Sequence, residues 1–312
     1  MGLRSLQTAA HGVYRVKIVF VGLMRWLSRM PLKGIRAMGH VLGWLLWGLM
    51  RSRKHIVQTN LTLCFPEKSL TQIKQLTRAH FVQFAQSLLD RAWLWHAPLQ
   101  VVQSRLKWVG TPAAFAQLDA DVPKIILAPH FVGLDAGGLA LTLRASKPVA
   151  FIFVPQHTKV MDEWVTEGRQ RTGNVKPYFR HDGAKQIMSG LRQGEMLHLS
   201  PDMDFGPEES IFVPFMGVNA ATVPSLSRFA KLGRAQVFML VTRMTPEGYE
   251  MDVHEAWKDF PTPDIRADTL RMNEELEKVI RNAPSQYYWV HKRFKSRPEG
   301  EASVYKNPAI WR

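Results

Sequence analysis

Residues 124–138 read KIILAPHFVGLDAGG and predict a strand, a turn and a helix in quick succession. The apolar run Ile125–Ala128 is typical of a short buried strand. Pro129 ends that run because proline has no amide hydrogen to give to a sheet, and Gly133 permits a tight turn. A helix is expected from Asp135 onwards. A buried strand joined to a helix in this way is a building unit of α/β domains.

The spacing of His130 and Asp135 has a chemical meaning. On one continuous helix, residues five apart point about 140° away from each other and do not meet. With His130 in a loop, a turn at Gly133 would instead fold the carboxylate back onto the imidazole, fix its tautomer, and leave the other ring nitrogen to take a proton from a substrate hydroxyl. No Ser or Cys lies nearby as a nucleophile, so the pair predicts direct transfer to an acceptor hydroxyl. A purely structural pair, with the Asp capping a helix, fits the same spacing.

Elements of both kinds alternate after residue 130. Strands are expected at 148–155, 195–200, 235–244 and 249–257, and helices at 158–172, 182–193 and 267–283. Before them, Ser69 would cap a long helix over 70–96 with apolar residues at helical spacing. We therefore predict an α/β fold with a central mixed sheet flanked by helices.

The composition is that of a folded, basic protein. The chain has 312 residues, 46% of them hydrophobic, so it is not disordered. Lys and Arg number 41 against 26 for Asp and Glu, a net charge of +15, which favours anionic partners such as a phospholipid surface, a phosphorylated substrate or an acidic protein. The basic residues do not cluster with aromatics in a nucleic-acid motif, so we expect no nucleic-acid partner. The single Cys64 excludes an internal disulfide framework and fits a reducing compartment.

The N-terminal part of the chain suggests a membrane surface. Its apolar runs, 18–24 and 38–50, are shorter than the roughly 20 residues that span a bilayer. Tryptophans at 26, 44 and 47 suit an interface, and the basic residues within 51–55 suit anionic headgroups. We predict that residues 1–55 anchor a domain of residues 56–312 to the membrane, through one tilted helix or two interfacial helices. A helical hairpin packed on the core is the alternative.

Two further segments follow predicted strands and carry polar residues. Arg180, in the segment YFRHD, lies where a helix begins and would bind a phosphate or lie free on the surface. The loop PDMDFG, 201–206, follows the strand at 195–200, and the ends of strands are where open α/β sheets place their sites. Asp202 and Asp204 there would hold a metal ion, position a polar substrate group or shape the loop. We expect His198, inside that strand, to belong to the core.

Several motifs together resemble a known family. The segment HFVGLD matches the H-x4-D motif of the glycerolipid and lysophospholipid acyltransferase superfamily. Beyond it, the chain is similar to the lipid A biosynthesis acyltransferases, the late acyltransferases of Gram-negative bacteria. The matching segments occur in the family's order over roughly residues 10–298 and are Asn60-Leu61, CFPE 64–67, the Arg180 segment, PDMDFG 201–206, FVPFMG 212–217, Ala221-Thr222 and WVHKRFK 289–295.

The resemblance implies an enzyme that works at the cytoplasmic face of the bacterial inner membrane. Such an O-acyltransferase moves a fatty acyl chain, of the lauroyl or myristoyl type, from acyl carrier protein or coenzyme A to a hydroxyl of a phosphorylated lipid A precursor. It requires no metal and no organic cofactor. His130 would be the base, Asp135 its partner, and Arg180 the residue near a substrate phosphate.

The resemblance also assigns the loops around the base. PDMDFG occupies the place where glycerol-phosphate acyltransferases carry a Pro-Glu-Gly motif, so Asp202, Asp204 and Gly206 would line the substrate site. The departure from that motif weakens a reading as a glycerol-phosphate acyltransferase. Backbone amides near Gly133 or Gly206 would stabilise the oxyanion of the reaction.

Other functions fit parts of the same pattern. A lysophospholipid acyltransferase would use the same chemistry on a different lipid acceptor. A metal-dependent phosphate-transfer enzyme or hydrolase would use His130, Asp135, Asp202 and Asp204 as ligands. A non-catalytic membrane-binding or nucleic-acid-binding protein is suggested by charge alone.

Overall fold

The structure is a computed structural model that describes residues 17–179 and 183–306. A helix over residues 17–27 opens the described part. The further helices are α2 (Leu32–Leu49), α3 (Arg51–Cys64), α4 (Leu70–His96), α5 (Leu99–Gln103), α6 (Pro112–Asp119), α7 (Leu134–Arg144), α8 (Lys159–Arg169), α9 (Gly183–Arg192), α10 (Ser225–Gly233) and α11 (Ile265–Asn282). The strands are β1 (Leu106–Gly110), β2 (Lys124–Leu127), β3 (Val149–Phe153), β4 (Val175–Phe179), β5 (Met196–Leu199), β6 (Ile211–Phe215), β7 (Val218–Thr222), β8 (Gln236–Thr245) and β9 (Gly248–Val253).

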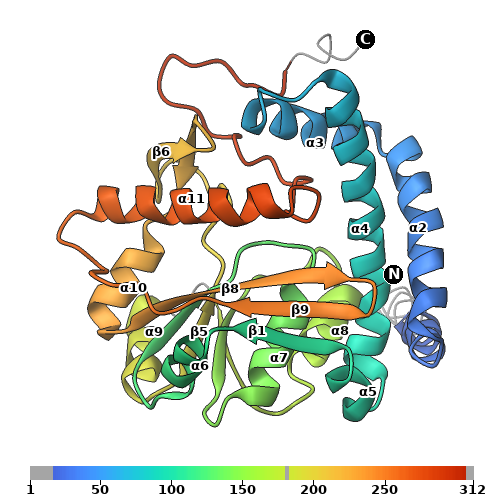
Figure 1. The fold of residues 1–312 in the computed structure, drawn as a ribbon, viewed down its shortest axis with the longest axis horizontal. Coiled ribbons are helices and arrows are strands. Elements are labelled where there is room, and N and C mark those ends of the chain that lie inside the picture. Colours follow the sequence, from blue (N-terminus) through green and yellow to red (C-terminus); the bar gives the residue numbers. More distant parts are fainter. Residues whose placement is uncertain (1–16, 180–182, 307–312) are drawn as a thin grey trace, which may run out of the picture.

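A seven-stranded sheet forms the centre of the fold, in the order β1-β9-β8-β2-β5-β3-β4 (Figure 1). The strands β8, β2, β5, β3 and β4 are parallel, whereas β9 pairs antiparallel with β8 and parallel with β1. The predicted mixed α/β sheet is therefore confirmed. A separate hairpin, β6–β7, lies beside α11 (Figure 1).

Strand β2 has apolar packing on both faces, which explains its uninterrupted apolar sequence. Ile125 and Leu127 belong to an apolar cluster that includes residues of α9, α10 and α11. Ile126 points to the opposite cluster, which includes residues of α4, α7 and α8. Because successive side chains of a strand alternate between faces, both layers need apolar partners from this one strand.

Helix α4 confirms the helix predicted over 70–96. Its N-terminus has a capping box in which the amide of Gln72 donates to the Ser69 hydroxyl and the amide of Ser69 donates to the Gln72 side chain, at 3.3 and 2.8 Å. Such a cap stabilises a helix by about 1 kcal/mol. The helix then runs for 27 residues and carries Arg91 and Trp95 towards the ends of the parallel strands.

Helix α2 packs along α4 through two glycines (Figure 1). A Cβ atom on Gly39 would lie 2.7 Å from the Gln86 side chain, and one on Gly43 would lie 2.5 Å from the Cα atom of Val82. The backbones of the two helices therefore approach each other closely at these glycines, while the opposite face of α2 is exposed. Helix α3 runs across residue 55, the predicted boundary between the membrane-anchoring segment and the following domain.

Within the described residues, no helix has the length and apolarity that crossing a bilayer requires.

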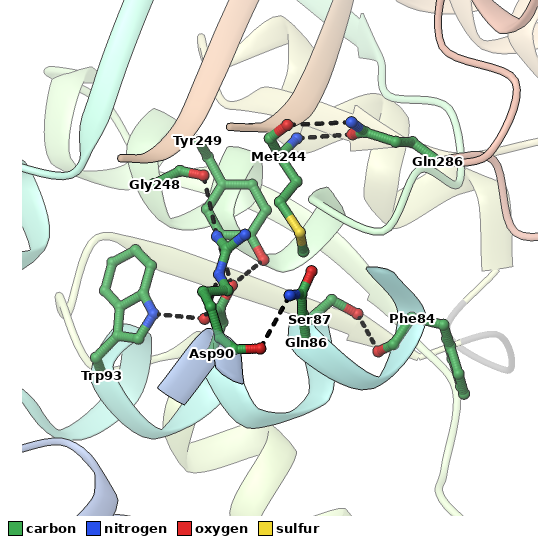
Figure 2. Close-up of polar contacts among 10 residues, drawn as sticks. Phe84, Gln86, Ser87, Asp90, Trp93, Met244, Gly248, Tyr249 and Gln286 are labelled. Carbon is green, nitrogen blue, oxygen red and sulfur yellow. Dashed lines mark hydrogen bonds and ion pairs between the residues drawn. The ribbon is translucent and has the colours of Figure 1, made fainter. Parts of the chain in front are cut away.

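A buried carboxylate ties α2, α4 and the β8–β9 turn together (Figure 2). Asp90 accepts hydrogen bonds from the Tyr249 hydroxyl at 2.7 Å, the Trp93 indole at 2.9 Å and Arg36 at 3.1 Å. Arg36 also donates to the carbonyl of Gly248 at 3.2 Å. Burial raises the pKa of Asp90, and the Arg36 charge opposes that shift. The network fixes α2, the second helix of an N-terminal hairpin formed by residues 17–49, against α4 and the β8–β9 turn.

Candidate active site

His130 and Asp202 come together because they follow neighbouring parallel strands. In the β2–β5 pairing, Leu127 lies opposite Leu199, and each of the two polar residues lies three positions further along its own chain. The amide of Ala128 continues the ladder by donating to the carbonyl of Leu199 at 2.9 Å. The carboxyl edge of the sheet, where such folds place their sites, therefore presents both side chains together.

The carboxylate of Asp202 holds His130 through two atoms. Its Oδ2 accepts the backbone amide of His130 at 2.9 Å, and its Oδ1 lies 2.6 Å from the ring Nδ1. Burial raises the pKa of the Asp202 carboxyl, but the His130 charge and hydrogen bonds outweigh burial, so this pKa lies below its usual value. An ionised carboxylate only accepts hydrogen bonds, so Nδ1 carries the proton and Nε2 of the neutral ring keeps its lone pair.

Asp135 has different partners from those expected. Its carboxylate binds Arg91 of α4 at 2.8 Å and Arg169 of α8 at 2.9 Å, and it makes no hydrogen bond with His130, although the structure describes both residues. The reason is that α7 begins at Leu134, so Asp135 lies in a helical first turn that faces α4 and α8. Burial raises the pKa of the Asp135 carboxyl, but the two guanidiniums hold that pKa well below its usual range.

Arg91 and Arg169 are residues that the sequence analysis missed. A signal existed for Arg91: it lies, with Asp90, among the apolar residues of a segment that reads LLDRAWLW, within the helix predicted over 70–96. Charged residues in such a segment are buried only when they are paired. The guanidinium of Arg91 also lies 5.4 Å from the ring of Trp95, and that of Arg169 lies 5.9 Å from the ring of Phe153.

The Asp204 side chain fixes the conformation of the PDMDFG loop. The Asp204 carboxylate accepts the amide of Ser296 at 2.6 Å, the Ser296 hydroxyl at 2.9 Å and the amide of Gly206 at 2.9 Å. Gly206 has φ = 105°, a conformation that favours glycine. Of the three readings considered for Asp204, these contacts match the one in which it shapes the loop.

Gly133 lets α7 approach β8 closely. A Cβ atom at this position would lie 2.6 Å from the carbonyl oxygen of Thr242. In the first turn of α7, the amides of Asp135 and Ala136 have no hydrogen-bond acceptor among the described residues. These two N–H groups lie within six residues of His130 at the positive end of a helix.

The C-terminal segment, residues 286–296, forms one wall of the site. Tyr287 pairs with Phe131 as an isolated antiparallel bridge, and the amide of Tyr288 donates to the carbonyl of His130 at 2.8 Å. The Tyr287 hydroxyl donates to the carbonyl of Asp202 at 3.2 Å. Gln286 fixes this segment to β8, because its side chain makes two hydrogen bonds to the backbone of Met244, at 2.7 and 3.0 Å (Figure 2). The segment therefore touches both loops that carry the His–Asp pair.

Two motifs of the resemblance have a structural explanation here. The Asn60 amide donates to the carbonyls of Trp289 and His291 at 2.8 and 2.7 Å. His291 in turn accepts the amide of Asp204 at 3.1 Å. Arg293 is buried and donates to Ala221 and Thr222 at 2.7 Å. These contacts join the segment after α11 to α3, to the PDMDFG loop and to β7.

Two remaining predictions have different outcomes. His198 is buried in β5, 4.8 Å from the ring of Phe151, which confirms its place in the core. Burial, assisted by the charges of Arg169 and His130, lowers the pKa of His198 to about 3, so the ring is neutral at pH 7. Arg180 lies outside the described residues, and its assignment to a phosphate stays a prediction.

The described residues contain no group of three or more His, Cys, Asp and Glu side chains close enough to share a metal ion. Asp135 and Asp204, two of the four ligands considered for a metal-dependent enzyme, are instead engaged by arginines and by backbone amides.

Comparison with known proteins identifies the family. The family model described as bacterial lipid A biosynthesis acyltransferase matches residues 6–296. A lipid A biosynthesis acyltransferase of Haemophilus influenzae is 35% identical over 249 residues, which is 78% of this chain and 76% of that protein. The lipid A biosynthesis lauroyltransferase of Escherichia coli is 29% identical over 95% of this chain and 96% of its own length.

One further relative and one solved structure also match this chain. The lipid A biosynthesis myristoyltransferase of E. coli is 30% identical over 84% of this chain and 81% of its own. Among solved structures, the 1-acyl-sn-glycerophosphate acyltransferase of Thermotoga maritima matches 78% of this chain and 94% of its own at 12% identity and a TM-score of 0.36, a likeness too low to decide anything. The family match over nearly the whole chain is decisive: the chain belongs to the bacterial lipid A biosynthesis acyltransferases.

Proposed function

We propose that this protein transfers a fatty acyl chain from the thioester of acyl carrier protein to a hydroxyl of a phosphorylated lipid A precursor, with His130 as the general base. The observation that carries the proposal is the pairing of His130 with Asp202. It leaves Nε2 of His130 without a hydrogen bond among the described residues, on a side chain that is 24% exposed. The basic chain, with a net charge of +15, suits an acidic carrier protein and a phosphorylated acceptor.

The reaction follows from the state of this ring. Nε2 of His130 takes the proton of the acceptor hydroxyl, and the oxygen attacks the thioester carbonyl carbon. The carbon–sulfur bond of the tetrahedral intermediate then breaks, and the imidazolium returns its proton to the departing thiolate. Asp202 stabilises the imidazolium between these two steps and keeps the ring oriented.

The oxyanion of the intermediate needs donors that are already in place. The amide of Gly206 is engaged by Asp204, which leaves the loop near Gly133 as the better source. The amides of Asp135 and Ala136 lack acceptors among the described residues and lie at a helix N-terminus. We assign the oxyanion to these amides.

Asp135 keeps a place in this mechanism, although not beside the imidazole. It holds the guanidiniums of Arg91 and Arg169, two positive charges against one negative charge, close to the His130 loop. The excess positive charge favours an anionic substrate or the developing oxyanion. The partner of the base in this proposal is Asp202.

The reaction is proposed to take place at the cytoplasmic face of the inner membrane. The exposed face of α2 is apolar, and its members lie within an arc of about 140° around the helix. They are Met38, Val41, Trp44, Leu45 and Leu49. The opposite face carries Ile35, Gly39 and Gly43, which are buried. An apolar stripe of this width on a helix that is already packed on its other side suits insertion into a lipid surface.

The test is mass spectrometry of lipid A from cells that lack the gene and cells in which it is restored. Loss of one secondary acyl chain on deletion, recovered by the wild type and not by His130→Ala, would support the proposal. His254→Ala is the matched control. His254 follows β9, which runs antiparallel to β8, so the chain there runs away from the end of the sheet that carries His130. Unchanged lipid A in the deletion strain, with no redundant enzyme present, would overturn the proposed acceptor.

A further inference from the structure

A pocket lies away from the His–Asp pair, where the N-terminal hairpin (residues 17–49) meets the end of α4. It has a volume of about 690 Å³, within the range of small-molecule sites. The turn between the helix over 17–27 and α2 forms one wall, and the last turn of α4 with the segment around α5 forms the other. Figure 1 shows α5 at the lower end of α4.

Three arginines line this pocket: Arg25, Arg29 and Arg105. No Asp or Glu lines it, and neither Arg25 nor Arg29 pairs with a carboxylate anywhere in the described part of the chain. The pKa of His96 reflects the positive charge of the pocket. Burial lowers the pKa of His96, which also lines the pocket, and Arg25 lowers that pKa further.

Arg105 supplies the most specific observation. Its Nη1 atom is buried and has no hydrogen-bond acceptor among the described residues. The backbone of Arg105 is fixed, since its carbonyl accepts the amide of Tyr249 at 2.9 Å, and its guanidinium lies 5.0 Å from the ring of Trp93. A buried guanidinium nitrogen without an acceptor is costly, and a phosphate oxygen would remove that cost.

The pocket lies beside an apolar surface. On the helix over 17–27, the exposed residues Ile18, Val19, Leu23 and Trp26 lie within an arc of about 140°, and Arg25 borders that arc. A basic residue at the edge of an apolar face is placed to meet a headgroup while its neighbours enter the acyl region. The pocket also connects to the site through α4, where Trp95 lines the pocket and Arg91, one turn earlier, holds Asp135.

We propose that the pocket of Arg25, Arg29 and Arg105 binds the phosphate group of a membrane lipid. This inference rests on the membrane-facing surface of the proposed function, but not on the identity of the acyl acceptor. The phosphate seats between the two exposed arginines, and the Arg105 side chain turns its buried Nη1 into the pocket to donate to it, while the rest of the lipid stays in the bilayer. A second anionic site of this kind orients the N-terminal hairpin on the membrane and keeps the carboxyl edge of the sheet near it.

The test measures binding of the full-length protein to phosphatidylcholine vesicles that contain either phosphatidic acid or phosphatidylglycerol, matched in surface potential. Phosphatidic acid exposes a phosphate monoester, so the wild type should prefer it. Arg25→Gln/Arg29→Gln should lower binding to phosphatidic acid by about tenfold or more and remove the preference. Arg105→Gln should also remove it.

Arg51→Gln/Lys54→Gln is the matched control, because it removes the same charge at the other end of α2. It should lower binding to the two kinds of vesicle by the same factor and keep the preference for phosphatidic acid. Arg25 and Arg29 are exposed, so the double variant should fold, and its circular dichroism should match the wild type.

Three outcomes would overturn the inference. The first is a double variant that keeps the wild-type preference for phosphatidic acid. The second is a wild type without preference whose vesicle binding is nevertheless displaced by inorganic phosphate, which would mark a site for soluble phosphates. The third is a wild type that binds no vesicle, which would also remove the proposed membrane surface. Lipid A mass spectrometry of the deletion strain is read independently of all three.

Discussion

Asp202 accepts two hydrogen bonds from a single residue, His130, one from its backbone amide at 2.9 Å and one from its ring at 2.6 Å. Fixing backbone and ring together leaves the imidazole little freedom to turn. The carboxylate also determines which ring nitrogen is protonated. An amide in its place would turn an N–H group towards one of these two donors.

The first prediction concerns Asp202→Asn. We expect the rate of acyl transfer to fall by about 10²- to 10⁴-fold, since the amide favours the tautomer that protonates Nε2 and removes the base. Turnover with an acyl carrier protein thioester measures the rate, and ¹⁵N NMR of His130 reports the tautomer. Glu208→Gln, an exposed carboxyl-to-amide change, should leave both unchanged. An active Asp202→Asn protein with the proton on Nδ1 would remove Asp202 from the mechanism.

The second prediction concerns Asp135→Asn and pH. The pKa of the Asp135 carboxyl in the folded protein lies below the ordinary value of 3.8, so its ionised form stabilises the folded state above pH 3.8. That contribution is lost as the pH falls below 3.8 towards the folded-state pKa. We expect Asp135→Asn to lower the free energy of unfolding by about 3 kcal/mol at pH 7, because two guanidiniums lose their carboxylate, and by less near pH 3.

Urea unfolding at the two pH values checks this second prediction. Asp121→Asn breaks an exposed ion pair with Lys147 and should change the free energy of unfolding little at either pH. A loss for Asp135→Asn that does not depend on pH would contradict the electrostatic explanation.

The third prediction concerns Gly133→Ala. The added methyl group would meet the carbonyl oxygen of Thr242 at 2.6 Å and push α7 away from β8. We expect a loss of about 1–3 kcal/mol in the free energy of unfolding, with a lower rate of acyl transfer because the His130 loop leads into α7. Gly48→Ala in α2 has open space around the new methyl group and should gain about 0.5–1 kcal/mol. Equal thermal stability of the two variants would show that α7 is not seated as described.

The fourth prediction concerns the apolar face of α2. Leu45→Ser/Leu49→Ser should lower partitioning into phosphatidylglycerol vesicles by about tenfold or more, because each leucine loses its transfer into the acyl region. Leu232→Ser in α10 is the control, since Leu232 is also exposed but lies on another helix. Partitioning that falls equally in both proteins would place the lipid-binding face elsewhere.

The sequence predicts the backbone of the site better than its contacts. The strand before His130 and the strand before Asp202 follow from apolar runs, and both residues were expected at strand ends. Their pairing depends on β2 and β5 being neighbours, which is a property of strand order and not of any local pattern. Asp135 was the nearest carboxylate in the sequence, whereas Asp202, 72 positions away, is the one that reaches the ring.

The elements that were missed are short or have mixed composition. Strand β1 reads LKWVG, which shows neither a regular alternation nor an apolar run. It lies at the edge of the sheet, where neither pattern is required. Strand β6 contains Pro214, which argues against a strand from sequence alone. Pro214 is exposed in a two-stranded hairpin, where a missing amide hydrogen is tolerated.

The contact between Tyr288 and the carbonyl of His130 has a consequence for how the protein is made. Strands β2 and β5 are synthesised early, but the wall that supports both catalytic loops comes from residues 286–296. A ribosome-bound chain can therefore form most of the sheet while its base is still unsupported. The hydrogen bonds from this segment to the loops of His130 and Asp202 form only after the residues of the sheet have been made, so the fixing of the base belongs to the last steps of folding.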